Sequence, residues 1–239
     1  MFAEPSASPQ RSDKRRVRDW IGWDVRNWSR ALDFWRRHST HDFSRCQALE
    51  LGAGRGGLSL WLAEQGATVE CSDVAGPAER AVRSHREHGV AGRITYTAID
   101  ATAIPYADRF DIVLFKSVLG LVGLHGGKSA QAKMLAEVRK ALRPGGELFF
   151  AENLVGSPLH MLLRRRQRRW GSRWRYVSLA ELHEMLAGYS FVRIQAAGVT
   201  GALGSTAAAQ DLLGTLDERA LELIVPDDWK YIAFGVARK

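Results

Sequence analysis

Hydrophobic positions along the chain follow two alternating spacings, which predict strands and helices in turn. Short apolar runs of the strand type lie at 46–51, 67–72, 93–99, 110–115 and 147–152. Apolar positions at helical spacing occur at 57–65, 78–88 and 129–142. Strands that alternate with helices pair in parallel, and helices then cover both faces of the sheet. The pattern therefore predicts an α/β fold of the doubly wound, mostly parallel type.

The C-terminal part adds two more strands to this pattern. It predicts a helix at 179–187, a strand at 191–196, a helix at 208–224 and a strand at 230–237. The sheet then has seven predicted strands. We expect the last two to form an antiparallel pair at one edge, so that the sheet ends in an antiparallel C-terminal strand.

A broad apolar face marks the predicted helix at 18–38. Its apolar positions at helical spacing are Ile21, Val25, Trp28, Leu32 and Trp35. Two interpretations stay open: the helix packs over the sheet as a cover, or it is a lid whose tryptophans line a pocket. The sequence thus predicts a disordered basic tail at 1–17, an N-terminal helical cap at 18–42 and one main domain at 43–239.

A glycine-rich loop joins the first strand of the main domain to its first helix. Glycines tolerate positive φ and let a ligand approach the backbone, and the free amides at a helix start attract anions. Gly52, Gly54 and Gly57 satisfy the dinucleotide pattern G-x-G-x-x-G, with Asp73 at the distance of its ribose-binding acid. Glu50 also fits, in the pattern E-x-G-x-G-x-G, although an acid is costly to bury without a partner.

The pattern E-x-G-x-G-x-G resembles motif I of the class I S-adenosylmethionine-dependent methyltransferases. The turn at 142–146, Leu-Arg-Pro-Gly-Gly, is similar to the Leu-Lys-Pro-Gly-Gly turn of that family, and the resemblance spans 46–152. It implies a Rossmann-like fold, S-adenosyl-L-methionine as cofactor and methyl transfer as activity. The cofactor-binding residues that it implies are Glu50, Gly52, Ala53, Gly54, Gly56, Asp73, Val74, Asp100, Ala101 and Lys116.

The resemblance also assigns parts of the cofactor to the strand ends. It implies that Glu50 lies near the methionine end, that Asp73 accepts from the ribose hydroxyls and that Asp100 meets the adenine amino group. The backbone around Lys116 would meet the amino-acid end of the cofactor. A lysine departs from the small or polar residues usual there. Its side chain either pairs with the cofactor carboxylate or extends to solvent.

No motif that we recognise in the sequence indicates the methyl acceptor. The chain has no N-P-P-Y or D-P-P-Y after the fourth strand, and neither cysteine is placed as a nucleophile. We expect a small molecule, a glycan or a lipid precursor. Substrate-pocket candidates are Trp28, His125, Asn153 and His160, and no catalytic base is assigned. Two alternatives remain, an NAD-binding oxidoreductase and a non-catalytic cofactor-binding module.

Basic residues outnumber acidic ones by 34 to 26, which gives a net charge of +8. Part of the excess lies between Arg164 and Arg175, within a predicted basic insert at 153–177 that also carries Trp170, Trp174 and Tyr176. This composition suits an anionic acceptor or an anionic membrane surface, or simply a solvated face, while nucleic acid is less favoured because no recognised module accompanies the charge.

The two cysteines fall in predicted strands and are interpreted as small buried apolar residues. They give no sign of a disulfide framework or a metal site, and the N-terminus lacks the apolar core of a secretory signal. We therefore expect a cytoplasmic protein, with attachment to the inner membrane face as an option that the basic insert leaves open.

Overall fold

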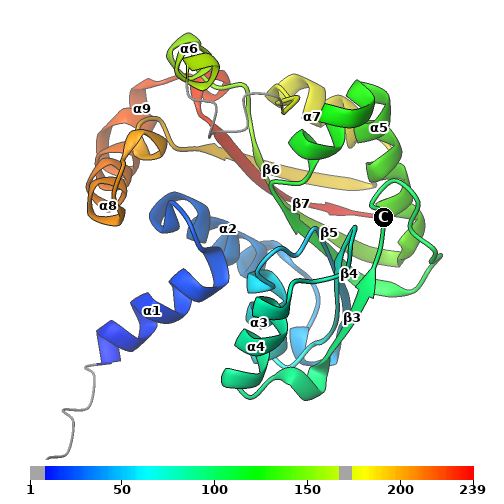
Figure 1. Ribbon diagram of the computed structural model, residues 1–239. Coiled ribbons are helices and arrows are strands. Elements are labelled where there is room, and N and C mark those ends of the chain that lie inside the picture. Colours follow the sequence, from blue (N-terminus) through cyan, green and yellow to red (C-terminus); the bar gives the residue numbers. More distant parts are fainter. Residues whose placement is uncertain (1–8, 167–173) are drawn as a thin grey trace, which may run out of the picture.

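The computed structural model describes residues 9–166 and 174–239, and within them the seven predicted strands form one sheet (Figure 1). The strand order is β3-β2-β1-β4-β5-β7-β6. The strands are β1 Gln47–Leu51, β2 Thr68–Asp73, β3 Ile94–Ala98, β4 Phe110–Lys116, β5 Leu142–Asn153, β6 Phe191–Ala197 and β7 Ile232–Arg238. The first five pair in parallel, whereas β7 runs antiparallel between β5 and β6. The predicted sheet type and antiparallel ending are confirmed.

Helices cover both faces of this sheet (Figure 1). The helices are α1 Pro9–Ile21, α2 Val25–His38, α3 Gly57–Glu64, α4 Glu79–Glu87, α5 Leu119–Ala141, α6 Pro158–Arg166, α7 Leu179–Met185, α8 Ala207–Leu216, the π-helical turn η4 Asp217–Leu221 and α9 Glu222–Ile224; the 3₁₀ turns are η1 Phe43–Arg45, η2 Ala91–Arg93, η3 Gly201–Leu203 and η5 Asp227–Trp229. Residues of α1, α2 and α3 share one hydrophobic cluster, and residues of α5 and α7 share the other. The sheet therefore separates two cores.

Alternation along β1 shows how one strand serves both cores. Ala48 belongs to the cluster on the α3 side, whereas Leu49 and Leu51 belong to the cluster on the α5 side. Successive side chains of a strand point to opposite faces, so both faces of a buried strand must be apolar. Glu50 is the exception, since it faces the α3 side and is buried. A carboxylate held there needs partners, which the helix that follows supplies.

The N-terminal region is two helices, so the single predicted helix at 18–38 is wrong. Gly22, at φ 83°, and Asp24, at φ 43°, break the chain between α1 and α2. Left-handed backbone ends a helix, and glycine adopts it without steric cost. The predicted disordered tail is also wrong for residues 9–17, which are helical, while residues 1–8 lie outside the described residues.

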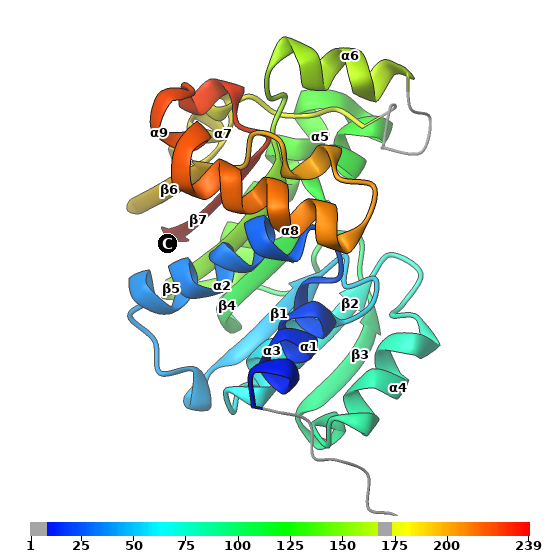
Figure 2. The ribbon, with the colours of Figure 1, turned by 90° about the vertical axis from the view of Figure 1, so that its left-hand side faces the viewer.

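Helix α2 packs firmly against the sheet. Trp35 is fully buried, stacks on Phe149 and donates its indole N–H to the Gly235 carbonyl at 3.0 Å. Helix α8 in turn lies across the outer side of α2 (Figure 2). Of the two interpretations of the N-terminal apolar face, the covering role is confirmed for α2.

Helix α5 begins ten residues earlier than predicted, at Leu119 instead of Ser129. The Glu152 carboxylate at the end of β5 accepts the Leu119 N–H at 2.7 Å and so supplies one of the helix's free first-turn amides with a partner. The glycine-rich segment at 123–127 is consequently helical up to Gly127, where φ is 64° and ψ is −158° and the helix kinks.

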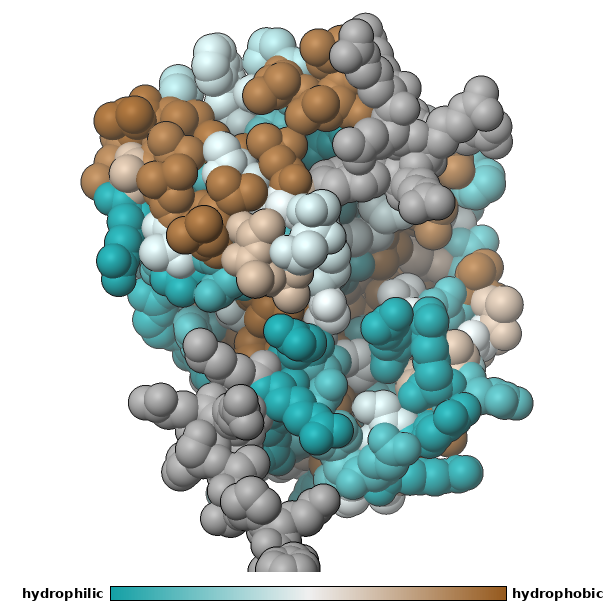
Figure 3. All heavy atoms as spheres, turned by 60° about the vertical axis from the view of Figure 1, so that its left-hand side comes forward, coloured by the Kyte–Doolittle hydropathy of each residue, from teal (hydrophilic) through white to brown (hydrophobic). Residues whose placement is uncertain are grey.

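Exposed apolar side chains gather on α8, α9 and α6 (Figure 3). They include Leu212, 72% exposed, and Leu223 and Ile224, which are about four-fifths exposed. On α6, Leu159 and Leu162 are half exposed. Large apolar side chains that cluster at a surface mark an interaction site more often than isolated ones do.

The close packing of α1 on α3 gives a first prediction. A Cβ on Gly57 would stand 2.1 Å from the Trp20 carbonyl oxygen. We expect Gly57→Ala to displace α1 at a cost of about 1–3 kcal/mol, as overpacking does, while the sheet stays intact. Hydrogen exchange of the α1 amides should quicken. Gly92→Ala is the matched control, because its Cβ would meet nothing within 4 Å; equal exchange in both variants would contradict the packing.

Candidate functional site

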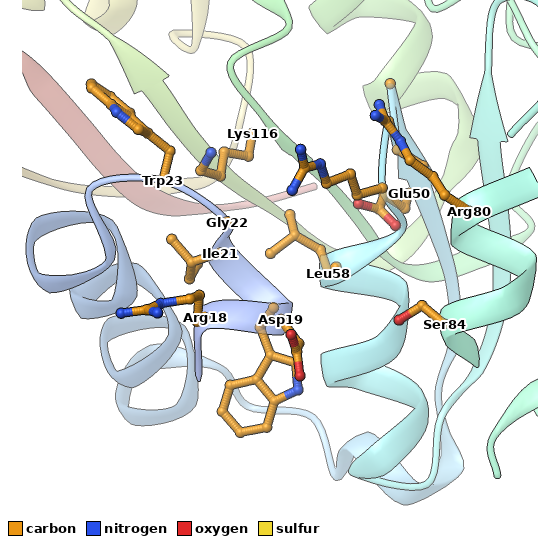
Figure 4. Close-up of a pocket in the computed structure, with 16 residues that line it drawn as sticks. Arg18, Asp19, Ile21, Gly22, Trp23, Glu50, Leu58, Arg80, Ser84 and Lys116 are labelled. Atoms are coloured by element: carbon orange, nitrogen blue, oxygen red, sulfur yellow. The ribbon is translucent and has the colours of Figure 1, made fainter. Parts of the chain in front are cut away.

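A cavity of about 780 Å³ opens at the glycine loop, at the carboxyl ends of β1 and β4 (Figure 4). Open parallel sheets bind ligands at this edge, and the volume is ordinary for a small-molecule site. Five of the predicted cofactor residues line it: Glu50, Gly52, Ala53, Gly54 and Lys116. The remaining lining residues come from α1 and the turn after it, from the glycine loop, from α3 and from α4: Arg18, Asp19, Trp20, Ile21, Gly22, Trp23, Arg55, Gly57, Leu58, Arg80 and Ser84.

Helix α1 therefore fits the second interpretation of the N-terminal apolar face, a lid whose tryptophans line a pocket. Trp20 and Trp23 line the cavity, and Trp20 donates its indole N–H to Glu64 of α3 at 2.7 Å. The covering and lid roles are thus divided between the two helices. The sequence offered this role as one of two interpretations, and it did not reveal the break at Gly22 and Asp24 that separates the two helices.

The glycine loop has the backbone that close approach of a ligand requires. Gly52, Gly54 and Gly56 have φ of 62°, 54° and 72°. A Cβ on Gly54 would meet nothing within 4 Å, so the space above it is open, whereas a Cβ on Gly52 would stand 2.7 Å from a Val118 methyl. The loop therefore fits a ligand laid across Gly54. Gly56 is buried instead, and its carbonyl accepts from His85 Nε2 at 2.8 Å.

Glu50 connects β1 to the start of α3. Its carboxylate accepts the Ser59 N–H at 2.8 Å and also the Ser59 hydroxyl, which together satisfy the buried charge and a free amide of the helix. Burial raises the pKa of Glu50 to about 7, although these hydrogen bonds oppose the shift. The buried acid therefore has a partner, which is the helix that follows the glycine loop.

Asp73 and Asp100 lie at the ends of β2 and β3, as predicted, but not among the residues that line the cavity. Asp73 accepts the Gly54 N–H at 3.0 Å and the Val74 N–H at 2.8 Å, so its carboxylate is held against the glycine loop. Asp100 accepts from the Thr102 N–H and hydroxyl, both at 2.8 Å, and these bonds lower the pKa of Asp100. Val74 is exposed, and Ala101 is partly buried against the α5 side.

Lys116 lines the cavity and its side chain points into it, which favours the first of its two predicted roles (Figure 4). Its Nζ lies 4.6 Å from the centre of the Trp28 ring. Among the described residues it has no hydrogen bond and no ion pair. Burial lowers the pKa of Lys116, while the charges of Glu152, Asp24 and Glu50 oppose this shift. A partly buried ammonium with three unused donors is a ready partner for an anionic ligand group.

A buried polar cluster that the sequence did not predict lies behind Lys116. The Asp24 carboxylate accepts from the Tyr231 hydroxyl and from Asn27, and Asn27 also donates to Asp217 at 3.4 Å. Burial raises the pKa of Asp24 to about 7. Asp24 was hidden inside a supposed continuous helix, and Gly22 two residues before it was the available signal of a break.

None of the four predicted substrate residues lines the cavity. Trp28 is 1% exposed and sits beneath Lys116, and His125 is exposed on α5. Asn153 donates its side-chain amide to the Ser117 hydroxyl at 2.9 Å. His160 is buried against Tyr231 and pairs with the Ser157 hydroxyl at 2.8 Å, and burial lowers its pKa to about 4. The structure thus places all four outside the lining of the cavity.

The two ends of the basic stretch point inward instead of presenting a charged platform. Arg164 is buried, donates to the Leu154 and Val155 carbonyls at 2.7 and 2.8 Å and stacks on Tyr176. Arg175 bonds Gln131 and Glu181. Residues 167–173, with Trp170, lie outside the described residues, as do the side chains of residues 165 and 166, so the platform itself stays a prediction.

Within residues 9–166 and 174–239, no group of three or more His, Cys, Asp or Glu side chains is arranged to hold a metal ion. The thiols of Cys46 and Cys71 are free and buried, and burial raises the pKa of Cys46 to about 12. Over the same residues, no helix combines the length and the apolar character that crossing a bilayer demands.

Comparisons with known proteins agree with this geometry. Residues 49–150 match the family model of a methyltransferase domain. Among solved structures, the phosphoethanolamine N-methyltransferase 2 of Haemonchus contortus, in complex with phosphomonomethylethanolamine and S-adenosylhomocysteine, is 19% identical, with a TM-score of 0.62; the match covers 97% of this chain and 58% of that one. This chain therefore spans less than two thirds of the length of that enzyme. No curated protein matches the sequence significantly.

Two further structures show how widely the fold is used. A SAM-dependent methyltransferase from Thermotoga maritima is 15% identical over 96% of both chains, with a TM-score of 0.59. The [4+2]-cyclase SpnF is 18% identical over 99% of this chain and 84% of that one, with a TM-score of 0.58. At such identities the likeness concerns the fold, and the fold alone does not fix the reaction.

The sheet order, the glycine loop and the matched domain define a Rossmann-like methyltransferase fold. The match of residues 49–150 to a methyltransferase domain agrees with the predicted class I S-adenosylmethionine-dependent family and with its cofactor. The predicted fold is confirmed.

The raised pKa of Glu152 predicts a pH dependence of stability. Burial raises the pKa of Glu152 to about 7 from 4.5, so the folded state binds more protons than the unfolded state between these values. The contribution of Glu152 to stability is therefore full below about pH 4.5, is lost as the pH rises toward 7, and amounts to at most about 3 kcal/mol. Urea unfolding at pH 5 and pH 8 measures this loss. It should be smaller in Glu152→Gln than in wild type.

The matched control for that comparison is Glu87→Gln, at an exposed position of α4. Its loss of stability between pH 5 and pH 8 should equal that of the wild type. If Glu152→Gln also behaves as the wild type does, the assigned protonation of Glu152 is wrong.

Proposed function

We propose that the protein transfers a methyl group from S-adenosylmethionine to a small-molecule, glycan or lipid-precursor acceptor. The observation that carries this proposal is the cavity at the E-x-G-x-G-x-G loop, with open space above Gly54 and with Glu50 at its inner end. When bound, S-adenosylmethionine supplies an electrophilic methyl group on a positively charged sulfur. The chain then has to bind the cofactor and the acceptor, orient them toward each other and enclose them.

We assign the binding roles by position at the strand ends. Asp73, held against the loop by the Gly54 N–H, retains carboxylate lone pairs for the two ribose hydroxyls. Asp100 and Ala101 follow β3 and would hold the adenine. Lys116, whose ammonium has no ion pair among the described residues, would bind the carboxylate at the amino-acid end. Charge supports the assignments of Asp73 and Lys116, whereas those of Asp100 and Ala101 rest on their position after β3.

Enclosure is the proposed contribution of α1. Trp20 and Trp23 form one wall of the cavity, and the Gly57 contact holds α1 against α3. A closed wall excludes water and holds acceptor and donor in the orientation that a direct displacement requires. No base is assigned, since a displacement needs one only where the acceptor atom must lose a proton.

A lipid-precursor acceptor is favoured by the apolar side chains exposed on α6, α8 and α9 (Figure 3). These helices flank the carboxyl edge of the sheet, so an acceptor with an apolar tail would find an apolar surface beside the site. A glycan acceptor has no comparable observation in its favour.

Isothermal titration calorimetry tests the cofactor, and a labelled methyl donor tests the reaction. We expect S-adenosylhomocysteine to bind and NADH not to, with Asp73→Asn weakening binding by about 1–3 kcal/mol, because a ribose hydroxyl loses its acceptor. Asp228→Asn, exposed in η5, is the control and should bind as wild type does. NADH binding without S-adenosylhomocysteine binding would refute the proposal. With a labelled methyl donor, label that appears in the polar or lipid fraction of a cell extract would show an enzyme. Absence of label from both fractions would indicate a non-catalytic cofactor-binding module.

A further prediction isolates Lys116. If its ammonium binds the cofactor carboxylate, Lys116→Met should weaken S-adenosylhomocysteine binding by about 1.5–3 kcal/mol, the usual value of a charge-assisted hydrogen bond. Binding of 5′-methylthioadenosine, which lacks the amino-acid end, should not change. Equal weakening of both ligands in calorimetry would mean that Lys116 only supports the fold of the pocket.

A further inference from the structure

The helices between β6 and β7 reverse the usual placement of charged and apolar side chains. Arg26 of α2 binds Glu218 of η4 at 2.7 Å. Arg30 of α2 binds Glu222 of α9 through two hydrogen bonds, at 2.6 and 2.9 Å. A surface helix normally turns its charged residues to solvent and its apolar residues to the protein. Here these acids bind the protein instead, through the arginines of α2.

The outer side of the same helices is apolar. Leu212 is 72% exposed, Leu223 80% and Ile224 78%. Figure 3 shows apolar side chains of α6, α8 and α9 together on one face of the molecule. We call the following exposed residues of these helices the apolar patch: Leu159, Leu162, Leu212, Leu216, Leu223 and Ile224. Apolar surface gathered in this way favours contact with a partner that removes it from water.

The acids beside the apolar patch already have cationic partners. Glu218 and Asp211 both lie close to Arg26, at 2.7 and 3.8 Å. Asp227 pairs with Lys230 at 2.6 Å. The surroundings of the patch therefore carry little uncompensated negative charge that would repel an anionic partner.

Positive charge beside the apolar patch is less compensated. Arg219 of η4 is exposed and has no ion pair within the part of the chain that the structure describes. Helix α6 ends in three consecutive arginines, and the chain as a whole carries a net charge of +8. Asp228 of η5 is the one exposed acid of 207–230 that lacks a cationic partner among the described residues. The balance of charge thus favours a partner with negative charge.

We propose that the apolar patch docks on an anionic lipid membrane surface, with α6, α8 and α9 at the interface. Lipid chains rearrange around protruding aliphatic side chains, whereas a protein partner would need a surface matched to three separate helices. Anionic headgroups attract the excess positive charge. Trp229, which follows α9 and is half exposed, is of the residue type enriched at the boundary between membrane and water. The docking stands on these residues and does not rest on the proposed function.

Co-sedimentation with vesicles tests the docking. One set of vesicles mixes phosphatidylcholine with phosphatidylglycerol, and the other is phosphatidylcholine alone. We expect the wild type to bind the anionic vesicles at least about threefold more tightly than the neutral ones. In Leu212→Gln/Leu223→Gln/Ile224→Gln, binding to the anionic vesicles should fall at least about tenfold, because three large apolar side chains no longer enter the membrane. S-adenosylhomocysteine binding should not change, since these positions are 72–80% exposed and outside the cavity.

The matched control is Leu121→Gln/Leu124→Gln/Phe191→Gln, which removes three exposed apolar side chains from α5 and β6. It should bind vesicles as the wild type does. Equal binding by the patch variant and the control would overturn the proposal, as would absence of vesicle binding to the wild type. Equal binding to both kinds of vesicle would overturn the anionic surface as the partner.

Two further outcomes separate the docking from other roles. If the wild type ignores vesicles but is a dimer in light scattering that the patch variant makes monomeric, the apolar patch is an interface between copies of the chain and the membrane proposal fails. If the wild type binds vesicles but not S-adenosylhomocysteine, the proposed function fails and the docking remains.

Discussion

The buried carboxylate of Glu50 is the contact on which the geometry of the site depends. It joins the end of β1 to the first turn of α3 through Ser59, and so fixes the glycine loop between them. Removing one partner would leave either a buried charge or an unpaired helix amide, and both cost more than the hydrogen bonds gain. The loop can therefore be rich in glycine, and intrinsically pliable, while it keeps one conformation.

A second buried acid at a strand end binds the start of a helix in the same way. Glu152 at the end of β5 accepts the Leu119 N–H at the start of α5, as Glu50 serves α3. In both cases a strand acid satisfies a helix start, and burial raises the pKa of each acid to about 7. Lys116 lies in the field of both carboxyls and of Asp24. The carboxyl edge thus gathers titratable groups whose pKa values depart from their usual ranges, which is typical of functional sites.

The break between α1 and α2 divides one apolar stretch into two functions. Helix α2 covers the sheet through Trp35, whereas α1 turns at Gly22 and presents Trp20 and Trp23 to the cavity. Asp24 holds the turn through Tyr231, which directly precedes β7. The lid is in this way tied to the C-terminal part of the sheet, more than 200 residues away in sequence.

The sequence alone predicted the sheet type, the glycine loop and the acids at the strand ends, because these depend on local spacing, whereas the cofactor was implied by the family resemblance. The prediction from sequence was wrong where residues distant in the chain decide the local structure. Leu119 starts a helix only because Glu152 is folded next to it, and the helix at 18–38 breaks where Asp24 meets Tyr231. The outward position of the apolar side chains on α8 and α9 is likewise decided by tertiary structure, since the arginines of α2 that bind Glu218 and Glu222 lie 192 residues earlier in the chain.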